Sequence, residues 1–398
     1  MSKPNNSGTP LWRVEENRKL HNNLEVVLDH EINGEELGKA VLRAVEVFPI
    51  LKDSVVLRDG LCYYEENANE IRVLPRERSI IPGSDALGGH FFCVTYSGRT
   101  IRSVISHSMT DGGGMIRFVR TLLYFYMSMH YGREFDHGYI EVEPVPKDEL
   151  YKDFWEMDHS GAEEVEEEKF IKVGYILPET VKGKQDNTYT KRCEMTIPGE
   201  DLIALSRRHN TSPSVMMFLL FAKAVYRECE DARDAAVAGR ITADARKALG
   251  IPGTFMNCSL GGQLSVTAGD LNSLSLSELG NSLRTSLKRQ ISPEYLRYTA
   301  RKVATERSFP RDLKPTISIS YMGTVDFGSM NDHVEKIVMY EGELHKLNAY
   351  AFKDVFHLIF HIGDGSERYA KAMSEILKEE GILSSVGPLE TMPEETDS

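Results

Sequence analysis

The residues best suited to chemistry in this chain are a histidine and an aspartate four positions apart, followed by glycines. His107 and Asp111 bound the motif, and Gly112, Gly113 and Gly114 come directly after it. A neutral imidazole with an ordinary pKa of about 6.5 can take a proton from an alcohol or an amine and later release it. The motif therefore predicts general acid–base catalysis by His107.

The residues around the motif predict the elements that hold it. The residues before the turn predict a strand, one face of which carries Ile101, Ser103, Ile105 and His107. This strand would place the histidine at its end, next to a turn. After the turn, apolar residues at helical spacing predict a helix that ends at Gly132. We expect the glycines to leave open space beside the imidazole for a substrate. The alternative is a core histidine, with Asp111 as the N-cap of the helix.

The run from His107 to Gly112 matches the signature H-x-x-x-D-G, and in this motif the chain resembles the HxxxD acyltransferases. That superfamily includes chloramphenicol acetyltransferase, the plant BAHD acyltransferases, alcohol O-acetyltransferases and the condensation domains of peptide synthetases. The pattern is most similar to bacterial alcohol O-acetyltransferase-like proteins. The resemblance implies that His107 is the general base and that Asp111 belongs to the catalytic set.

A second segment, Asp244-Ala245-Arg246-Lys247, resembles the V-D-x-R segment of the family. In relatives its arginine pairs with the aspartate of the main motif, so the resemblance gives that role to Arg246. Arg240 is the second candidate. Two surface arginines are the alternative that the residues alone leave open.

A third segment, Asp326-Phe327-Gly328, resembles the D-F-G-W-G element of the plant enzymes, with Ser329-Met330 in place of the final Trp-Gly. In relatives this element lies away from the reacting atoms. The resemblance therefore implies structural roles for Asp326 and Gly328, as it does for Gly112, Gly113 and Arg246.

The family fold implied by these motifs is α/β (α+β), with two lobes like chloramphenicol acetyltransferase. Each lobe is a mixed sheet flanked by helices, and the active-site tunnel lies between the lobes. We expect an N-terminal lobe at 1–160, an acidic interlobe linker at 161–188, a C-terminal lobe at 189–383 and a disordered tail at 384–398. The runs Gly34-Glu35-Glu36-Leu37 and Gly199-Glu200-Asp201-Leu202 each open a predicted helix, which suggests two related lobes.

Composition narrows the class of protein further. The 398 residues are 41% apolar and 27% charged, as in a soluble globular protein, and the net charge of −13 argues against a nucleic-acid partner. The cysteines are scattered without metal-binding spacing, which predicts reduced thiols, no metal site and a cytoplasmic location: they are Cys62, Cys93, Cys193, Cys229 and Cys258. No apolar run is long enough to predict a membrane span. We expect no permanently bound cofactor.

The resemblance implies transfer of an acyl group to a small-molecule alcohol or amine without a covalent acyl-enzyme. Condensation domains usually carry a second histidine directly before the catalytic one, where this chain has Ser106. We therefore expect acyl-CoA as the co-substrate. The alternatives are a condensation-type module that takes its donor from an acyl carrier protein, and a catalytically silent homologue that only binds.

A cationic stretch in this otherwise acidic chain predicts where the coenzyme A phosphates bind. Arg301 and Lys302 lie in the middle of it, and we assign them to donor binding. Solvated helix faces are the alternative, because lysine and arginine are mostly exposed.

Overall fold

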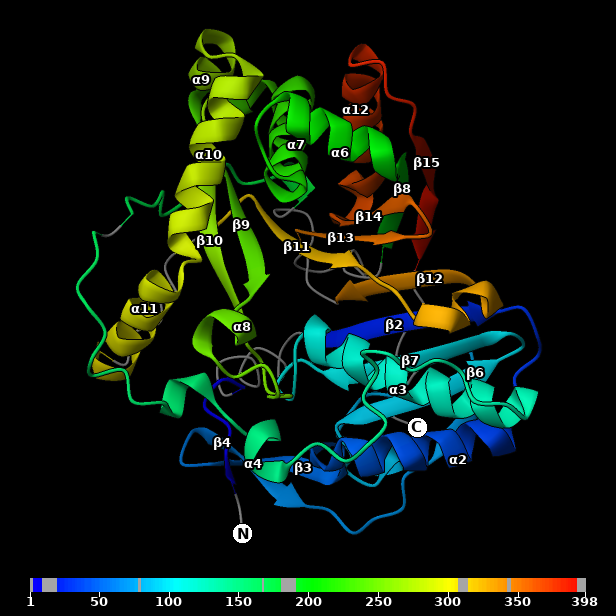
Figure 1. Cartoon of the computed structure of the whole chain (residues 1–398). Coiled ribbons are helices and arrows are strands. Elements are labelled where there is room, and N and C mark those ends of the chain that lie inside the picture. Colours follow the sequence, from blue (N-terminus) through cyan, green and yellow to red (C-terminus); the bar gives the residue numbers. More distant parts are fainter. Residues whose placement is uncertain are drawn as a thin grey trace.

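The computed structural model describes residues 3–8, 20–77, 80–166, 168–179, 191–306, 314–341 and 345–391. In this part of the chain the strands form two large mixed sheets and one small sheet, with helices packed on the large ones (Figure 1). This arrangement confirms the predicted fold class. None of the helices in these ranges combines the length and the hydropathy that a membrane crossing requires.

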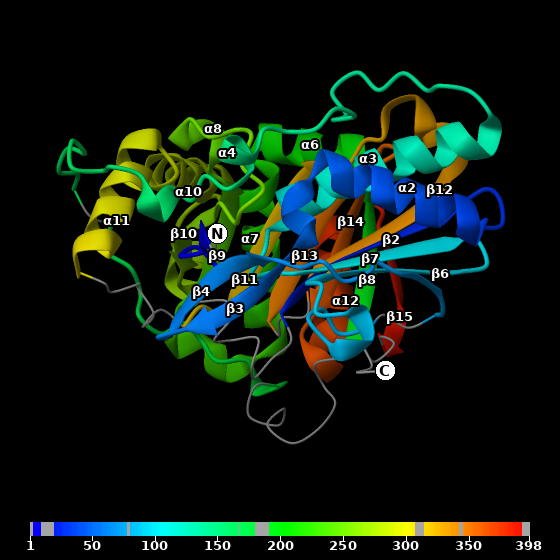
Figure 2. The same ribbon diagram turned by 90° about the horizontal axis from the view of Figure 1, so that it is seen from below.

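The first large sheet has five strands in the order β12-β2-β7-β6-β5. Its strands are β2 (His21–Leu28), β5 (Val73–Pro75), β6 (Phe92–Ser97), β7 (Thr100–Ser106) and β12 (Val334–Glu341). Helices α2 (Gly34–Val47) and α3 (Gly112–Tyr131) lie together over it (Figure 2), and their buried residues join its core. The small sheet beside it contains β1 (Lys3–Pro4), β3 (Asp53–Arg58) and β4 (Leu61–Glu66). The last two form a hairpin whose turn residues, Asp59 and Gly60, both have positive φ.

The second large sheet has seven strands in the order β10-β9-β11-β13-β14-β8-β15. They are β8 (Lys191–Pro198), β9 (Val237–Asp244), β10 (Ser259–Val266), β11 (Ile317–Thr324), β13 (Lys346–Phe352), β14 (Val355–His361) and β15 (Ser385–Thr391). The helices that contribute to its core are α6 (Gly199–Arg208), α7 (Pro213–Glu228), α10 (Leu276–Gln290) and α12 (Ser366–Glu379). Helix α7 is buried on nearly every side within this core.

Shorter elements complete the described chain. The remaining helices are α4 (Lys147–Leu150), α8 (Arg246–Leu249), α9 (Ala268–Ser273) and α11 (Pro293–Glu306). Short 3-10 turns are η1 (Pro49–Lys52), η2 (Asp85–Leu87), η3 (Phe154–Glu156), η5 (Glu230–Asp234), η6 (Gly328–His333) and η7 (Gly363–Gly365). A small apolar cluster joins η3, α8 and α11 through Phe154, Leu249 and Leu296.

Strand β12 comes from the second half of the chain but belongs to the first large sheet. It pairs antiparallel with β2, with Val338 opposite Glu25 and Glu341 opposite Asn22. In Figure 1 it lies on the side of that sheet nearest the second lobe. The expected C-terminal lobe at 189–383 therefore needs a correction, because Val334–Glu341 complete the other sheet. The reason is the apolar face of β12, where Ile337 is fully buried in the first core.

The expected disordered tail at 384–398 is also wrong for Ser385–Thr391. These residues form β15, which pairs with β8 at the edge of the second large sheet. Val386 and Leu389 pack against its core, and Pro388 falls at a shift in register. An edge strand tolerates such a proline because one side of its backbone needs no partner. The rest of the tail, 392–398, lies outside the described residues.

The acidic segment at 161–188 lies against the second lobe where it is described. Tyr175 and Leu177 enter the second core. Glu168 pairs with Arg289 of α10, and Glu164 pairs with Arg301 of α11. The segment is therefore a connection that packs on the lobe it leads to, while residues 167 and 180–188 lie outside the described part.

Candidate active site

The predicted strand-to-helix elbow is confirmed at the junction of β7 and α3. His107 follows the end of β7, and its backbone N–H donates to the carbonyl of Leu20 at 3.0 Å. Asp111 is the N-cap of α3, where its Oδ1 accepts from the N–H of Gly114 at 3.1 Å. Gly132 ends the helix with φ +60. His107 and Asp111 therefore lie on either side of a turn that both flanking elements hold.

Asp111 and Arg246 form the ion pair that the family resemblance implied. The guanidinium donates to Asp111 Oδ1 at 2.9 Å, and both side chains are about 5% exposed. The other carboxylate oxygen accepts from the N–H of Cys258 at 2.8 Å. Burial alone would raise the pKa of Asp111, but Arg246 and these hydrogen bonds hold it below its ordinary value. Arg240, the second candidate, is exposed on β9 and is not this partner.

Arg246 holds more than the aspartate. Its Nε donates to the carbonyl of Thr254 at 2.9 Å, and a terminal nitrogen donates to the carbonyl of Met256 at 2.7 Å. It also reaches Asp244 at 3.1 Å, but that carboxylate is 55% exposed. Arg246 thus connects the elbow of the first lobe with the loop of the second lobe that leads to β10.

The glycines after the motif lie close to other side chains, while Gly112 and Gly113 also line the cavity that His107 faces. A Cβ on Gly112 would meet Met322 Cε at 2.8 Å, and one on Gly114 would meet Thr110 Oγ1 at 1.9 Å. A Cβ on Gly113 would meet Arg246 at 2.9 Å. The chain's own side chains therefore fill the places where larger residues would stand. The sequence showed missing side chains but not these neighbours.

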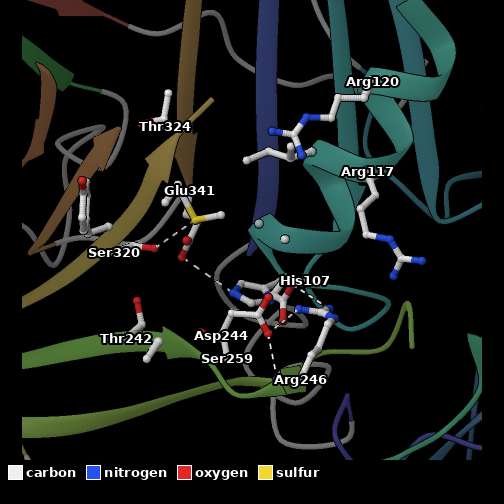
Figure 3. Close-up of a pocket in the computed structure, with 17 residues that line it drawn as sticks. His107, Arg117, Arg120, Thr242, Asp244, Arg246, Ser259, Ser320, Thr324 and Glu341 are labelled. Atoms are coloured by element: carbon white, nitrogen blue, oxygen red, sulfur yellow. Dashed lines mark hydrogen bonds and ion pairs between the residues drawn. The ribbon is translucent and has the colours of Figure 1, made fainter. Parts of the chain in front are cut away.

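A cavity of about 330 Å³ lies where α3 of the first lobe faces β9, β10 and β11 of the second (Figure 3). His107 lines it, together with Gly112, Gly113, Ile116, Arg117 and Arg120 of α3. From the second lobe come Thr242, Asp244, Ser259, Ser320, Tyr321, Met322 and Thr324. Glu341, at the end of β12, completes the wall. This volume is in the range of small-molecule sites.

Both ring nitrogens of His107 have a neighbour. Nδ1 lies 3.2 Å from the amide nitrogen of Asn257, and Nε2 lies 3.7 Å from Oε2 of Glu341. Because Asn257 Oδ1 accepts from the N–H of Ser259 at 2.9 Å, the amide presents its nitrogen to the imidazole. Nδ1 is then the acceptor, which leaves the proton of a neutral ring on Nε2, facing Glu341.

Glu341 sets the charge around the imidazole together with Lys346. The Lys346 ammonium lies 2.7 Å from Glu341 Oε2, and both side chains are at most 10% exposed. Burial acts to lower the pKa of His107, but Glu341 raises it, and the net shift is upward. Burial acts to raise the pKa of Glu341, but Lys346 and His107 hold it well below its ordinary value. Glu341 is therefore an anion beside a basic imidazole.

Sequence reasoning missed Glu341 and Lys346, although a signal was present. Glu341 ends an apolar run, Ile337-Val338-Met339-Tyr340, just as His107 ends the run that begins at Ile101. A charged residue directly after four consecutive apolar residues is unusual enough to examine. Nothing in the local pattern shows that these two strand ends face each other.

The other predicted residues lie away from the cavity wall. Asp326 accepts from the N–H of Gly328 at 2.9 Å, and Gly328 has φ +60, so both shape the turn after β11. Arg301 and Lys302 are on α11 and do not line the cavity. The Arg301 guanidinium donates to the carbonyl of Ala162 at 2.6 Å and pairs with Glu164. Across the described ranges, no three His, Cys, Asp or Glu side chains are grouped to hold a metal ion.

Comparisons with known proteins find likeness in structure alone, because no family model and no curated protein sequence matches the chain. The structure is similar to that of F. graminearum TRI101 complexed with coenzyme A and T-2 mycotoxin, with a TM-score of 0.66 at 13% identity, over 97% of this chain and 99% of that one. It is also similar to TRI3 trichothecene 15-O-acetyltransferase from Fusarium sporotrichioides, with a TM-score of 0.58 at 12% identity, over 94% of both chains. A third similar structure is the epimerization domain of tyrocidine synthetase B, with a TM-score of 0.57 at 12% identity, over 92% of this chain and 95% of that one. The chain therefore shares the fold of these acetyltransferases and of the epimerization domain, which agrees with the fold that the resemblance implied.

Proposed function

We propose that this chain is an acyltransferase that moves an acyl group from acyl-CoA to a hydroxyl or an amine of a small molecule. The observation that carries the proposal is the position of His107, which faces a cavity of about 330 Å³ between the lobes. The elbow that presents it is fixed by the buried Asp111–Arg246 pair. Solved structures of the same fold include TRI101 with coenzyme A and a trichothecene acetyltransferase, which support a thioester donor and a small acceptor.

The proposed reaction needs one base and no covalent acyl-enzyme. As the acceptor oxygen or nitrogen attacks the thioester carbonyl carbon, its proton passes to His107 Nε2. The tetrahedral intermediate then collapses with cleavage of the C–S bond, and the imidazolium returns the proton to the thiolate. Atoms and charge balance without any further reactant.

The resting geometry adds a requirement to this mechanism. A base at Nε2 needs a neutral ring whose proton is on Nδ1, whereas Asn257 now presents an amide nitrogen to Nδ1 at 3.2 Å. Rotation of the Asn257 amide would present its oxygen instead and stabilise the tautomer in which Nε2 is free. That rotation breaks the hydrogen bond from the N–H of Ser259, which holds the amide in its present orientation. We therefore propose that the Asn257 amide rotates only when substrate binds.

The test of the function is a screen of acyl-CoA donors against pooled alcohols and amines, read by mass spectrometry and by thiol release. Acylated product with free coenzyme A is the expected result. A parallel series with acyl groups loaded on a carrier protein tests the condensation-type alternative. If product forms only with the loaded carrier protein, that carrier and not acyl-CoA is the donor. Binding without product in either series would favour the silent homologue.

We expect Glu341→Gln to move the acid limb of the profile of kcat/KM against pH to lower pH. His107 must be unprotonated to accept a proton, so activity is lost as the pH falls through its pKa in the free enzyme. That pKa is raised by the Glu341 carboxylate against the opposing effect of burial. Without the carboxylate the imidazolium is less stable, and the limb shifts down. The measurement is kcat/KM from pH 5 to pH 9 with the substrates found by the screen.

Lys346→Met is the matched control, because the Lys346 cation acts to lower the pKa of His107. Its acid limb should shift upward. Opposite shifts distinguish an electrostatic effect on His107 from a general loss of stability, which both variants share through the broken 2.7 Å pair. Shifts in the same direction would contradict the role given to Glu341.

A further inference from the structure

One face of α3 forms part of the cavity wall and carries two arginines. Gly113, Ile116, Arg117 and Arg120 line the cavity at the three- and four-residue spacing of one helix face. In Figure 3 the two guanidinium groups point in different directions, with that of Arg120 turned toward the side of Thr324. Their surroundings differ as well.

Arg117 is neutralised within the protein. Its Nε donates to Glu141 Oε1 at 2.8 Å, and one terminal nitrogen donates to the carbonyl of Thr254 at 2.7 Å. Two carbonyl contacts to Gly253 at 3.3 Å complete its set. Arg117 therefore needs no ligand to balance its charge.

Arg120 has no such counter-ion. Its Nε donates to the backbone carbonyl of Asp326 at 2.7 Å, and its guanidinium lies 5.0 Å from the ring centroid of Tyr139. Within the ranges that the structure describes, no carboxylate lies within 4.0 Å of it. The Asp326 carboxylate itself accepts from Gly328 and Asn331. Burial lowers the pKa of Arg120. The opposing influence of Tyr139, Asp326 and Glu141 is too weak to restore the ordinary value.

The other charged side chains around the cavity each have a partner of opposite charge within 4.0 Å. Arg246 pairs with Asp111 and Asp244, and Glu341 pairs with Lys346. A half-buried guanidinium without a carboxylate is costly unless a ligand supplies the negative charge. Its planar fork of N–H donors matches a carboxylate or a phosphate with two parallel hydrogen bonds.

We propose that Arg120 binds an anionic group, a carboxylate or a phosphate, of a substrate that occupies the cavity of His107. This inference rests on the proposed function and adds a specificity residue to it. The anion has two possible sources: a phosphate of coenzyme A on the donor, or a carboxylate on the acceptor.

The experiment compares Arg120→Gln with wild type on two pairs of ligands, each differing in the anion. Calorimetry gives the affinities for coenzyme A and for pantetheine, which lacks the phosphates. Turnover gives KM for carboxylate-bearing acceptors and for their methyl esters. Loss of a charge-assisted hydrogen bond should weaken binding of the anionic ligand in one pair by roughly 10- to 100-fold and leave binding of its neutral counterpart unchanged. The pair that responds identifies the source.

Two further variants separate charge from packing. Arg120→Lys keeps a positive charge and should retain part of the preference for the anion. Arg43→Gln, on the exposed face of α2, removes an arginine that pairs with Glu46 at 3.6 Å, and should change nothing. If Arg120→Gln does not fold, Arg120→Lys replaces it in the comparison. An ammonium cannot form the two parallel hydrogen bonds, so this variant should also bind the anionic ligand more weakly while its affinity for the neutral ligand is unchanged. Equal losses for charged and neutral ligands would overturn the proposal.

A third measurement does not depend on the proposed function. Pyrophosphate and succinate should raise the melting temperature of wild type more than that of Arg120→Gln, with glycerol as the neutral comparison. If the screen finds no acyl transfer but this difference is present, the anion site stands and the function fails. Equal responses of the two proteins to both anions, with no change in either ligand pair, would overturn the anion site whatever the reaction is.

Discussion

His107→Ala should fold with near-normal thermal stability and lose turnover by roughly a hundred- to ten-thousand-fold, as expected when a positioned acid–base group is removed. The imidazole lines the cavity and belongs to none of the apolar core clusters of the described chain, so its removal enlarges the cavity and leaves those clusters intact. Glu341 keeps its ion pair with Lys346 at 2.7 Å, which limits the cost to folding. The measurements are turnover with the substrates from the screen, melting temperature and coenzyme A binding, which should persist.

His357→Ala is the matched control, because it removes a histidine that lies outside the cavity. His357 Nδ1 lies 2.7 Å from Glu194 on the neighbouring strand. Its loss should lower stability modestly and leave turnover unchanged. Equal turnover of wild type and His107→Ala would refute the mechanism, and an unfolded His107→Ala protein would favour the alternative of a structural core histidine.

Asp111→Ala should lower the free energy of unfolding by about 3 to 5 kcal/mol, the usual cost of removing one member of a buried ion pair. It leaves Arg246 about 5% exposed without its nearest carboxylate. It also leaves the N–H groups of Gly114 and Cys258 without their acceptor. Activity should fall with stability, because these contacts fix the turn that presents His107. Chemical denaturation with a parallel activity assay measures both.

Asp244→Ala is the control for that loss. The same arginine reaches Asp244 at 3.1 Å, but this carboxylate is 55% exposed, so water replaces much of the interaction. We expect a cost of about 1 kcal/mol or less. Similar losses in the two variants would show that burial of the Asp111 pair is not what stabilises the elbow.

The Asp111 carboxyl also predicts how stability depends on pH. Its pKa in the folded protein lies below the unfolded value of 3.8. Its contribution is therefore fully present above that unfolded value and is lost as the pH falls through the lower, folded pKa. Denaturation curves from neutral to acid pH should show a smaller acid-dependent loss for Asp111→Ala than for wild type.

Local patterns were enough to predict the elbow and several elements. Alternation placed His107 at the end of a strand, and Gly132 ended the following helix as expected. The runs that begin at Gly34 and Gly199 do open helices. The pairing of Asp111 with Arg246 came from resemblance, since the two residues are 135 positions apart and no local signal indicates their contact.

What the sequence did not reveal depends on contacts between distant segments. No strand was predicted for Val334–Glu341, whose residues do not alternate, and nothing in that segment identifies β2 as its partner. Glu341 therefore reaches His107 through a pairing that no short motif encodes. Arg120 was missed for a related reason: whether an arginine is balanced by a carboxylate depends on which side chains the fold brings near it.

Strand β12 has a consequence for the independence of the lobes. If the chain were cut after residue 160, β2 would lose its neighbour on one side and expose an unpaired row of N–H and C=O groups. Such an open edge invites pairing with other chains, so the first lobe expressed alone should aggregate. A peptide spanning Val334–Glu341 should pair with that edge in place of β12. The sheet of the first lobe is thus completed by β12, a strand that is synthesised after most of the second lobe. The first lobe can therefore finish folding only late in synthesis.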